Sequence, residues 1–204
     1  MEIMLPVALS GFLLMSSLVV AVGPENAFIL RQGLTGRHVG LVVSLAVLID
    51  LVLIALGCLG LGALIGGQAL LLKAISWAGA LFLVYYAYGA FRRALHPHGL
   101  GPETGSSTSV GVALRVLLAV TILNPNVLLD TVLIVGGTSA RYDGSERLWY
   151  FLGAGLASTL WFILVGGGAR YLRGFFASTR VWRCFELANG LIMLWAASRI
   201  VMPA

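Results

Sequence analysis

Three acidic residues lie inside long uncharged stretches of this 204-residue chain: Glu25, Asp50 and Asp130. A charge at the centre of a bilayer costs at least about 2.5–3.5 kcal/mol, so such acids persist when they are paired, protonated or exposed to a wet cavity. Burial favours the neutral form of a carboxyl group, and a nearby cation favours the charged form. A carboxyl group in this setting can therefore hold a proton and a cationic ligand in turn.

Two proline-centred sequences lie in the same uncharged stretches, and each has asparagine next to or near the proline: Gly23-Pro24-Glu25-Asn26 and Asn124-Pro125-Asn126. Proline removes a backbone donor and clashes with the preceding turn, so both helices are expected to break there. A broken helix exposes unpartnered backbone groups, and its new N-terminal end favours a carboxylate. The asparagine amides can donate and accept hydrogen bonds beside the breaks, or they can simply cap the helices.

Acids and breaks together match the ammonium and carboxylate ends of an amino acid. Three intramembrane acids without a firmly intramembrane base favour a positively charged substrate. The residues predicted to bind substrate or couple protons are Glu25, Asn26, Asp50, Asn124, Asn126 and Asp130, with helix breaks at Gly23, Pro24 and Pro125.

The elements that position these residues are predicted to be transmembrane helices. Hydrophobic residues make up 59% of the chain and charged residues 10%, whereas soluble domains carry about 25% charged residues. This composition excludes a disordered chain and argues against a soluble enzyme. At about 20 residues a span, the uncharged stretches predict an all-α integral membrane protein with six spans, at residues 3–30, 39–64, 74–91, 112–137, 149–169 and 185–202.

The chain is predicted to be a single transporter domain made of two related halves, residues 1–95 and 112–204, joined by a polar linker at 96–111. The positions that match in order are Pro24 with Pro125, Asp50 with Ser158, and Gly79 with Gly190. Because each half has three spans, the second half must be inverted in the bilayer relative to the first, as in many secondary transporters. Chance similarity between two apolar halves is the alternative.

Loop charge predicts the orientation. The loops after the first, third and fifth spans carry nine arginines, and the opposite side carries four basic residues. Because basic loops stay in the cytoplasm, both termini are expected outside. The same pattern explains the net charge of +5 without nucleic acid as a partner. Arginines near the span ends offer the acids an alternative role in structural ion pairs, with Arg31 or Arg115 as partner.

Other chemistry has little support in the sequence. The cysteines Cys58 and Cys184 are far apart, and His96 and His98 flank a loop proline, so no metal site or cofactor is predicted. No phosphate-binding loop for ATP occurs. Small residues at helix-contact spacing, as at 62–66, would permit a homodimer. The tryptophans are expected to include membrane-interface anchors: Trp77, Trp149, Trp161, Trp182 and Trp195.

The segments 23–33 (GPENAFILRQG) and 123–131 (LNPNVLLDT) resemble the paired signatures of the LysE family of amino-acid exporters, and the lysine and arginine branch in particular. The resemblance extends over nearly the whole chain, although Glu25 stands where the family pattern usually has glutamine. It implies a non-enzymatic protein in a bacterial inner membrane that exports L-arginine or L-lysine using the proton motive force.

Four other functions are alternatives to basic amino-acid export. An exporter of neutral amino acids or of a metal cation could share the same architecture. A membrane redox enzyme would need facing cysteines in the first and fourth spans, which this sequence lacks. A structural subunit without transport would not need acids in the membrane.

Overall fold

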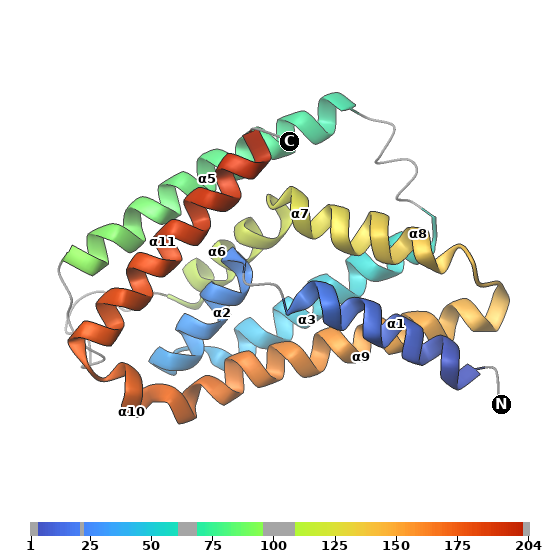
Figure 1. Cartoon of the computed structure of the whole chain (residues 1–204), viewed down its shortest axis with the longest axis horizontal. Helices are drawn as coiled ribbons and strands as arrows, with labels where there is room; N and C mark the ends of the chain where they lie inside the picture. Colours follow the sequence, from blue (N-terminus) through green and yellow to red (C-terminus); the bar gives the residue numbers. More distant parts are fainter. Residues whose placement is uncertain (1–3, 21–22, 61–68, 96–108, 202–204) are drawn as a thin grey trace.

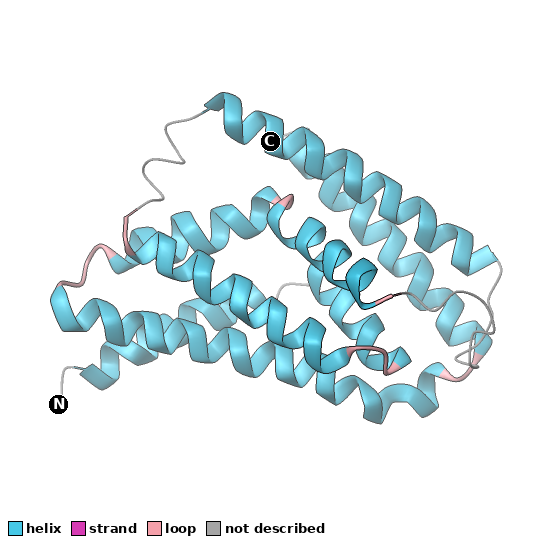
Figure 2. Cartoon of the chain, turned by 180° about the vertical axis from the view of Figure 1, so that it is seen from behind, coloured by secondary structure: helices cyan, strands magenta, loops and turns pink. Residues whose placement is uncertain are grey.

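The computed structural model describes residues 4–20, 23–60, 69–95 and 109–201, and every regular element in these ranges is helical (Figures 1 and 2). In the first half, the helices are α1 Met4–Val19, α2 Pro24–Thr35, α3 Val39–Cys58 and α5 Ala69–Leu95. The predicted proline break is present, because α2 begins at Pro24 after an extended Gly23, and α1 and α2 meet at 81°. Helix α2 ends at Thr35, and the next residue, Gly36, has a φ of 72°, the left-handed conformation typical of a residue that follows a helix.

The second half has a similar break. Helix α6, Val110–Ile122, begins with the Ser109 side chain accepting a hydrogen bond from the Val112 amide. It ends just before Asn124, and the chain resumes as α7 at Pro125, as predicted. The remaining elements are α7 Pro125–Leu128, a π-helix at Leu129–Val135, α8 Gly136–Ser139, α9 Gly144–Gly168, a 3₁₀ turn at Ala169–Leu172, α10 Arg173–Phe176 and α11 Thr179–Val201.

Two groups of helices are visible in Figure 1. Helices α1 and α9 pack along each other, and α3 crosses α9 and the π-helix. Helices α5 and α11 form a separate pair that lies side by side along most of their length. Helix α2 lies between the two groups and contacts both α9 and α11. The two proline breaks therefore lie in the interior, where α2 and α7 begin.

Glycines allow the first group to pack backbone against backbone. A Cβ added to Gly153 in α9 would collide with the Ala8 carbonyl of α1. A Cβ added to Gly136 in α8 would lie 2.5 Å from the Cα of Gly57 in α3. Small residues at such contacts are typical of helices that associate within lipid. These two contacts fix α1 on α9 and α8 on α3.

The helix bounds correct several of the predicted spans. Helix α5 begins earlier and ends later than the predicted 74–91, and α11 begins before 185, because charged residues in the end turns continue the helices. Among the described helices, Val39–Cys58 and Gly144–Phe176 are long and apolar enough to cross a membrane, and α1 with α2 is a third candidate if the bent pair forms one span. Most of the predicted 96–111 linker, with His96 and His98, lies outside the described residues.

Candidate functional site

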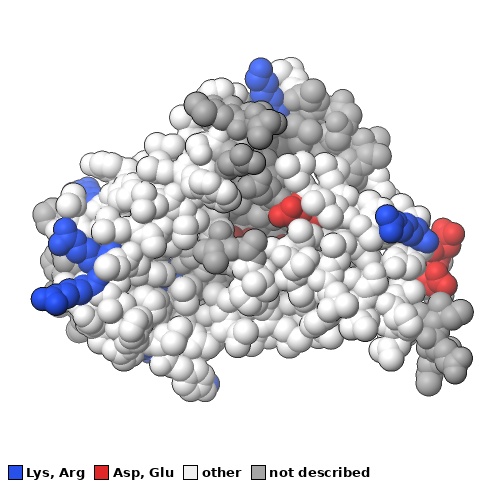
Figure 3. Space-filling view, viewed as in Figure 1, with Lys and Arg blue, Asp and Glu red and all other residues white. Residues whose placement is uncertain are grey.

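A cavity of about 250 Å³ lies where the two broken helices meet. Its volume is below the range of about 300–1,000 Å³ typical of drug-sized ligands, which suits a single small metabolite. Figure 3 shows acidic atoms in the middle of an otherwise largely uncharged face, between charged groups at the two ends of the molecule. Of the predicted residues, those that line the cavity are Gly23, Pro24, Glu25, Asn26, Asp50, Asn124 and Asp130.

Glu25 lies in the first turn of α2, directly after the first break. A carboxyl group is favourable at this end of a helix, where backbone N–H groups are unpartnered. The residue is only 8% exposed, and its Oε1 accepts a hydrogen bond of 2.8 Å from the Thr121 hydroxyl. Thr121 is in the last turn of α6, just before the second break. The two breaks are thus joined by a hydrogen bond between the halves of the chain.

Asp50 is contributed by the unbroken helix α3 and is 2% exposed. Its Oδ2 accepts a hydrogen bond of 2.5 Å from the hydroxyl of Ser158 in α9. Asp50 and Glu25 both line the cavity and are close enough to interact electrostatically. Ser158 was matched with Asp50 in the proposed repeat, but its role as a hydrogen-bond donor to that residue was not predicted.

Asn26 stabilises the first break through both ends of its amide. Its Nδ2 donates to the carbonyl of Val19, the last residue of α1, at 2.8 Å. Its Oδ1 accepts a hydrogen bond of 3.0 Å from the indole Nε1 of Trp161 in α9. Trp161 therefore supports the site indirectly, through its hydrogen bond to Asn26. Because the break leaves carbonyls at the end of α1 without helical partners, the Asn26 amide replaces one lost backbone donor.

The second break contributes Asn124 and Asp130 to the cavity lining. Asn124 is 5% exposed, and its backbone carbonyl accepts a hydrogen bond of 3.1 Å from the Val127 amide as α7 begins. Asp130 is half-buried and lies in the π-helix, a geometry that is frequent at functional sites. Pro125 and Asn126 lie in α7, but their side chains are outside the described part of the structure.

The lining of the cavity is acidic. It contains Glu25, Asp50 and Asp130, and no lysine, arginine or histidine is among the described residues that line it. Apolar groups such as Phe162 and Trp195 form most of the remaining wall. In the described part of the chain, no three histidine, cysteine or acidic side chains are grouped so as to hold a metal ion. This arrangement can bind a small organic cation by charge and shape.

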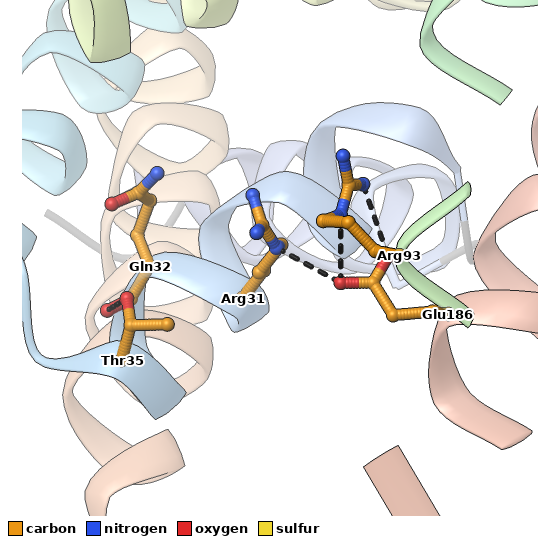
Figure 4. A network of polar contacts seen from close by, with 5 residues as sticks. All are labelled: Arg31, Gln32, Thr35, Arg93 and Glu186. Atoms are coloured by element: carbon orange, nitrogen blue, oxygen red, sulfur yellow. Dashed lines mark hydrogen bonds and ion pairs between the residues drawn. The ribbon is translucent and has the colours of Figure 1, made fainter. Parts of the chain in front are cut away.

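A third buried acid was not predicted from the sequence. Glu186 of α11 has a side chain with no exposed surface, and it pairs with Arg31 of α2 and Arg93 of α5 (Figure 4). The Arg31 Nε lies 3.1 Å from Oε1, and Arg93 donates to both carboxylate oxygens at 3.0 Å. The alternative in which Arg31 neutralises an acid of the cavity is therefore wrong, because Arg31 pairs with Glu186. Arg115, the other suggested partner, donates to the Gly111 carbonyl of its own helix.

Comparison with known proteins identifies relatives over almost the whole chain. Residues 16–203 match the model of the family described as LysE type translocator. A protein named "Putative amino-acid transporter" in Mycobacterium tuberculosis is 40% identical over 93% of this chain and 94% of its own. Arginine exporter proteins ArgO of Pectobacterium carotovorum and Serratia proteamaculans are 34% and 35% identical over 93% of this chain, and the match covers 94% and 93% of their lengths. No solved structure matches the chain.

Proposed function

Because the chain belongs to the LysE type translocator family, we propose that it exports basic amino acids, L-arginine or L-lysine, by proton antiport. Members of this family are multi-pass membrane transporters and not enzymes, and every regular element in the described part of this chain is helical. The cationic substrate is supported by one observation above all. The cavity between the two breaks is lined by three acids, with no basic side chain among its described lining residues.

In the proposed exchange, Asp50 and Asp130 bind the substrate cation and a proton in turn. Asp50 is nearly inaccessible, Asp130 is half-buried, and both line the cavity, so a cation or a proton that enters the cavity can neutralise either carboxylate. In water, a carboxylate is stabilised only slightly by a nearby cation. In a site of low dielectric an unpaired charge is costly, so the carboxylate needs either a proton or a cation. Proton and substrate cation therefore compete for the same oxygens, and that competition couples their opposite movements.

The breaks are proposed to hold the other groups of the amino acid. The backbone N–H groups at the starts of α2 and α7 favour the α-carboxylate. Asn26, Asn124 and Asn126 add hydrogen bonds to the α-carboxylate and α-ammonium. Glu25 adds a third acid next to Asp50, which strengthens attraction for a substrate with a cationic side chain.

A six-span inverted repeat, with halves at 1–95 and 112–204, is supported by how matching helices pack. Helix α2, which follows the first break, packs on α9 where Gly33 meets the Gly166 carbonyl. Helix α8, which follows the second break, packs on α3 where Gly136 meets Gly57. Helices α3 and α9 hold matching places in the two halves, and Asp50 and Ser158 meet each other between them. Residues near a pseudo-two-fold axis are expected to contact their own counterparts in this way.

The proposed location is a bacterial inner membrane with both termini outside. The arginines of the α2–α3 loop, α10 and the start of α11 then face the cytoplasm, as the distribution of basic residues favours. Labelling of a single cysteine introduced at either terminus by a membrane-impermeant reagent on intact cells tests this orientation. Labelling only after the cells are broken would place the termini in the cytoplasm.

Counterflow in proteoliposomes tests the function. Vesicles loaded with unlabelled arginine are expected to take up labelled arginine and lysine, with uptake lost in Asp50→Asn. The matched control is Asp143→Asn, because the Asp143 side chain is fully exposed and pairs only loosely with Arg147 at 3.8 Å. Dependence of uptake on an imposed pH gradient tests proton antiport. Uptake of threonine or leucine instead would assign the protein to neutral substrates, and no amino-acid uptake would make metal cations the next substrates to test.

A further inference from the structure

The acids of the first half of the chain are held by hydroxyl groups of the second half. Thr121 donates to Glu25 from α6, and Ser158 donates to Asp50 from α9. Both hydroxyl-bearing residues have no exposed surface. A buried hydroxyl group needs a hydrogen-bond partner inside the protein. Each of these two donates its hydrogen bond to a carboxyl group that lines the cavity.

Each acid uses only one of its two oxygens in these contacts. Thr121 binds Oε1 of Glu25, and Ser158 binds Oδ2 of Asp50. In the described part of the chain, the second oxygen of each acid accepts no hydrogen bond, and both residues line the cavity. One oxygen of each carboxyl group is therefore fixed to the protein, while the other is available to a cation.

We propose that Thr121 and Ser158 are positioning residues that determine the affinity for the cationic substrate. This inference rests on the proposed function, since it assumes that the cavity binds a cation. A hydrogen bond from a hydroxyl group to a carboxylate is short and directional, so it fixes the rotamer of the acid. A carboxylate fixed beforehand loses less conformational entropy when the substrate binds, and this gain raises affinity without a new contact.

Variants that keep or remove each hydroxyl group test the proposal in the counterflow assay. Thr121→Val removes the hydroxyl group with little change in shape, and Thr121→Ser keeps it. Ser158→Ala removes the second hydroxyl group. Its matched control is Thr159→Ala, which removes a neighbouring hydroxyl group of α9 that bonds only to the Gly155 carbonyl of its own helix.

Loss of a hydrogen bond to a charged group is expected to raise the KM for arginine on the order of tenfold in Thr121→Val and Ser158→Ala. The maximal rate should stay near that of the wild type, and loss of one buried hydrogen bond should lower the melting temperature by only a few degrees. Thr121→Ser and Thr159→Ala should keep the wild-type KM. A merely structural role would lower the melting temperature and the maximal rate without this selective change in KM.

Two results would overturn the proposal. The first is an equal KM in Thr121→Val and Thr121→Ser, which would show that the hydroxyl group is irrelevant. The second is an equal KM in Ser158→Ala and Thr159→Ala. Both results require a wild-type protein that exchanges arginine. If the wild type exchanges no cationic amino acid, the proposed function itself fails, and this inference fails with it.

Discussion

The two arginines that pair with Glu186 should contribute unequally to the free energy of unfolding, Arg93 more than Arg31. Arg93 makes two hydrogen bonds to the buried carboxylate and Arg31 makes one. Hydrogen bonds to charged groups contribute about 1.5–3 kcal/mol each. The arginine side chains are 31% and 21% exposed, so solvent screening places each bond at or below the low end of that range. We therefore expect Arg31→Gln to cost about 1 kcal/mol and Arg93→Gln about 2 kcal/mol.

Removal of both arginines should lower the free energy of unfolding further, and for a different reason. Glu186 would then be a buried carboxylate without a cation, and breaking a buried pair in this way costs about 3–5 kcal/mol. In a chain of this length, 1 kcal/mol corresponds to roughly 2–4 °C in melting temperature. Adding Glu186→Gln to the double variant should restore much of the loss, because the uncompensated charge is gone.

Melting temperatures of the purified variants in one detergent, followed by the loss of monodisperse protein on heating, measure these differences. Arg92→Gln is the matched control, since Arg92 is exposed in the same turn of α5. If the triple variant melts no higher than the double variant, buried charge is not the source of the instability. If Arg92→Gln destabilises as much as Arg93→Gln, the contacts with Glu186 contribute nothing specific.

Two further outcomes are expected. Asp50→Asn should abolish arginine counterflow but leave the melting temperature near that of the wild type, because the amide keeps an oxygen that can accept from Ser158. Retained counterflow in this variant would exclude Asp50 as the residue that exchanges cation and proton. Gly136→Ala should lower the melting temperature, since overpacking against Gly57 typically costs about 1–3 kcal/mol. Gly137→Ala, where an added Cβ meets nothing within 4 Å, should not lower it, and an equal loss in both variants would contradict the backbone contact.

The proline breaks and the acids of the cavity could be predicted because their causes are local. Pro24 and Pro125 interrupt a helix whatever surrounds them, and the structure has a helix beginning at each. Asp50 in an otherwise apolar helix requires a special environment, which follows from its desolvation alone. The sequence alone therefore predicts that the proline breaks and the buried acids belong to one site.

The residues that hold the acids could not be predicted in the same way. A threonine or a serine in an apolar helix carries no local sign of its partner, and Thr121 is 96 residues from Glu25 in the sequence. Ser158 had one usable signal, since it matches Asp50 in the proposed repeat. Glu186 was overlooked because it lies at the edge of the predicted sixth span, where an acid is expected to reach water.

The π-helix has a consequence for register. Each residue of an α-helix turns the chain by about 100°, and a π-helix accommodates more residues per turn, so it changes which way all later side chains face. Asp130 lines the cavity, while Gly136, at the end of the same segment, must meet Gly57 of α3. The wider turn between them lets one continuous segment satisfy both requirements. The interval from proline to packing glycine is also longer here, from Pro125 to Gly136, than from Pro24 to Gly33 in the regular helix α2. Deleting one residue from 129–135 would therefore separate the acid from the cavity or the glycine from its contact, although it would leave every other residue of the chain unchanged.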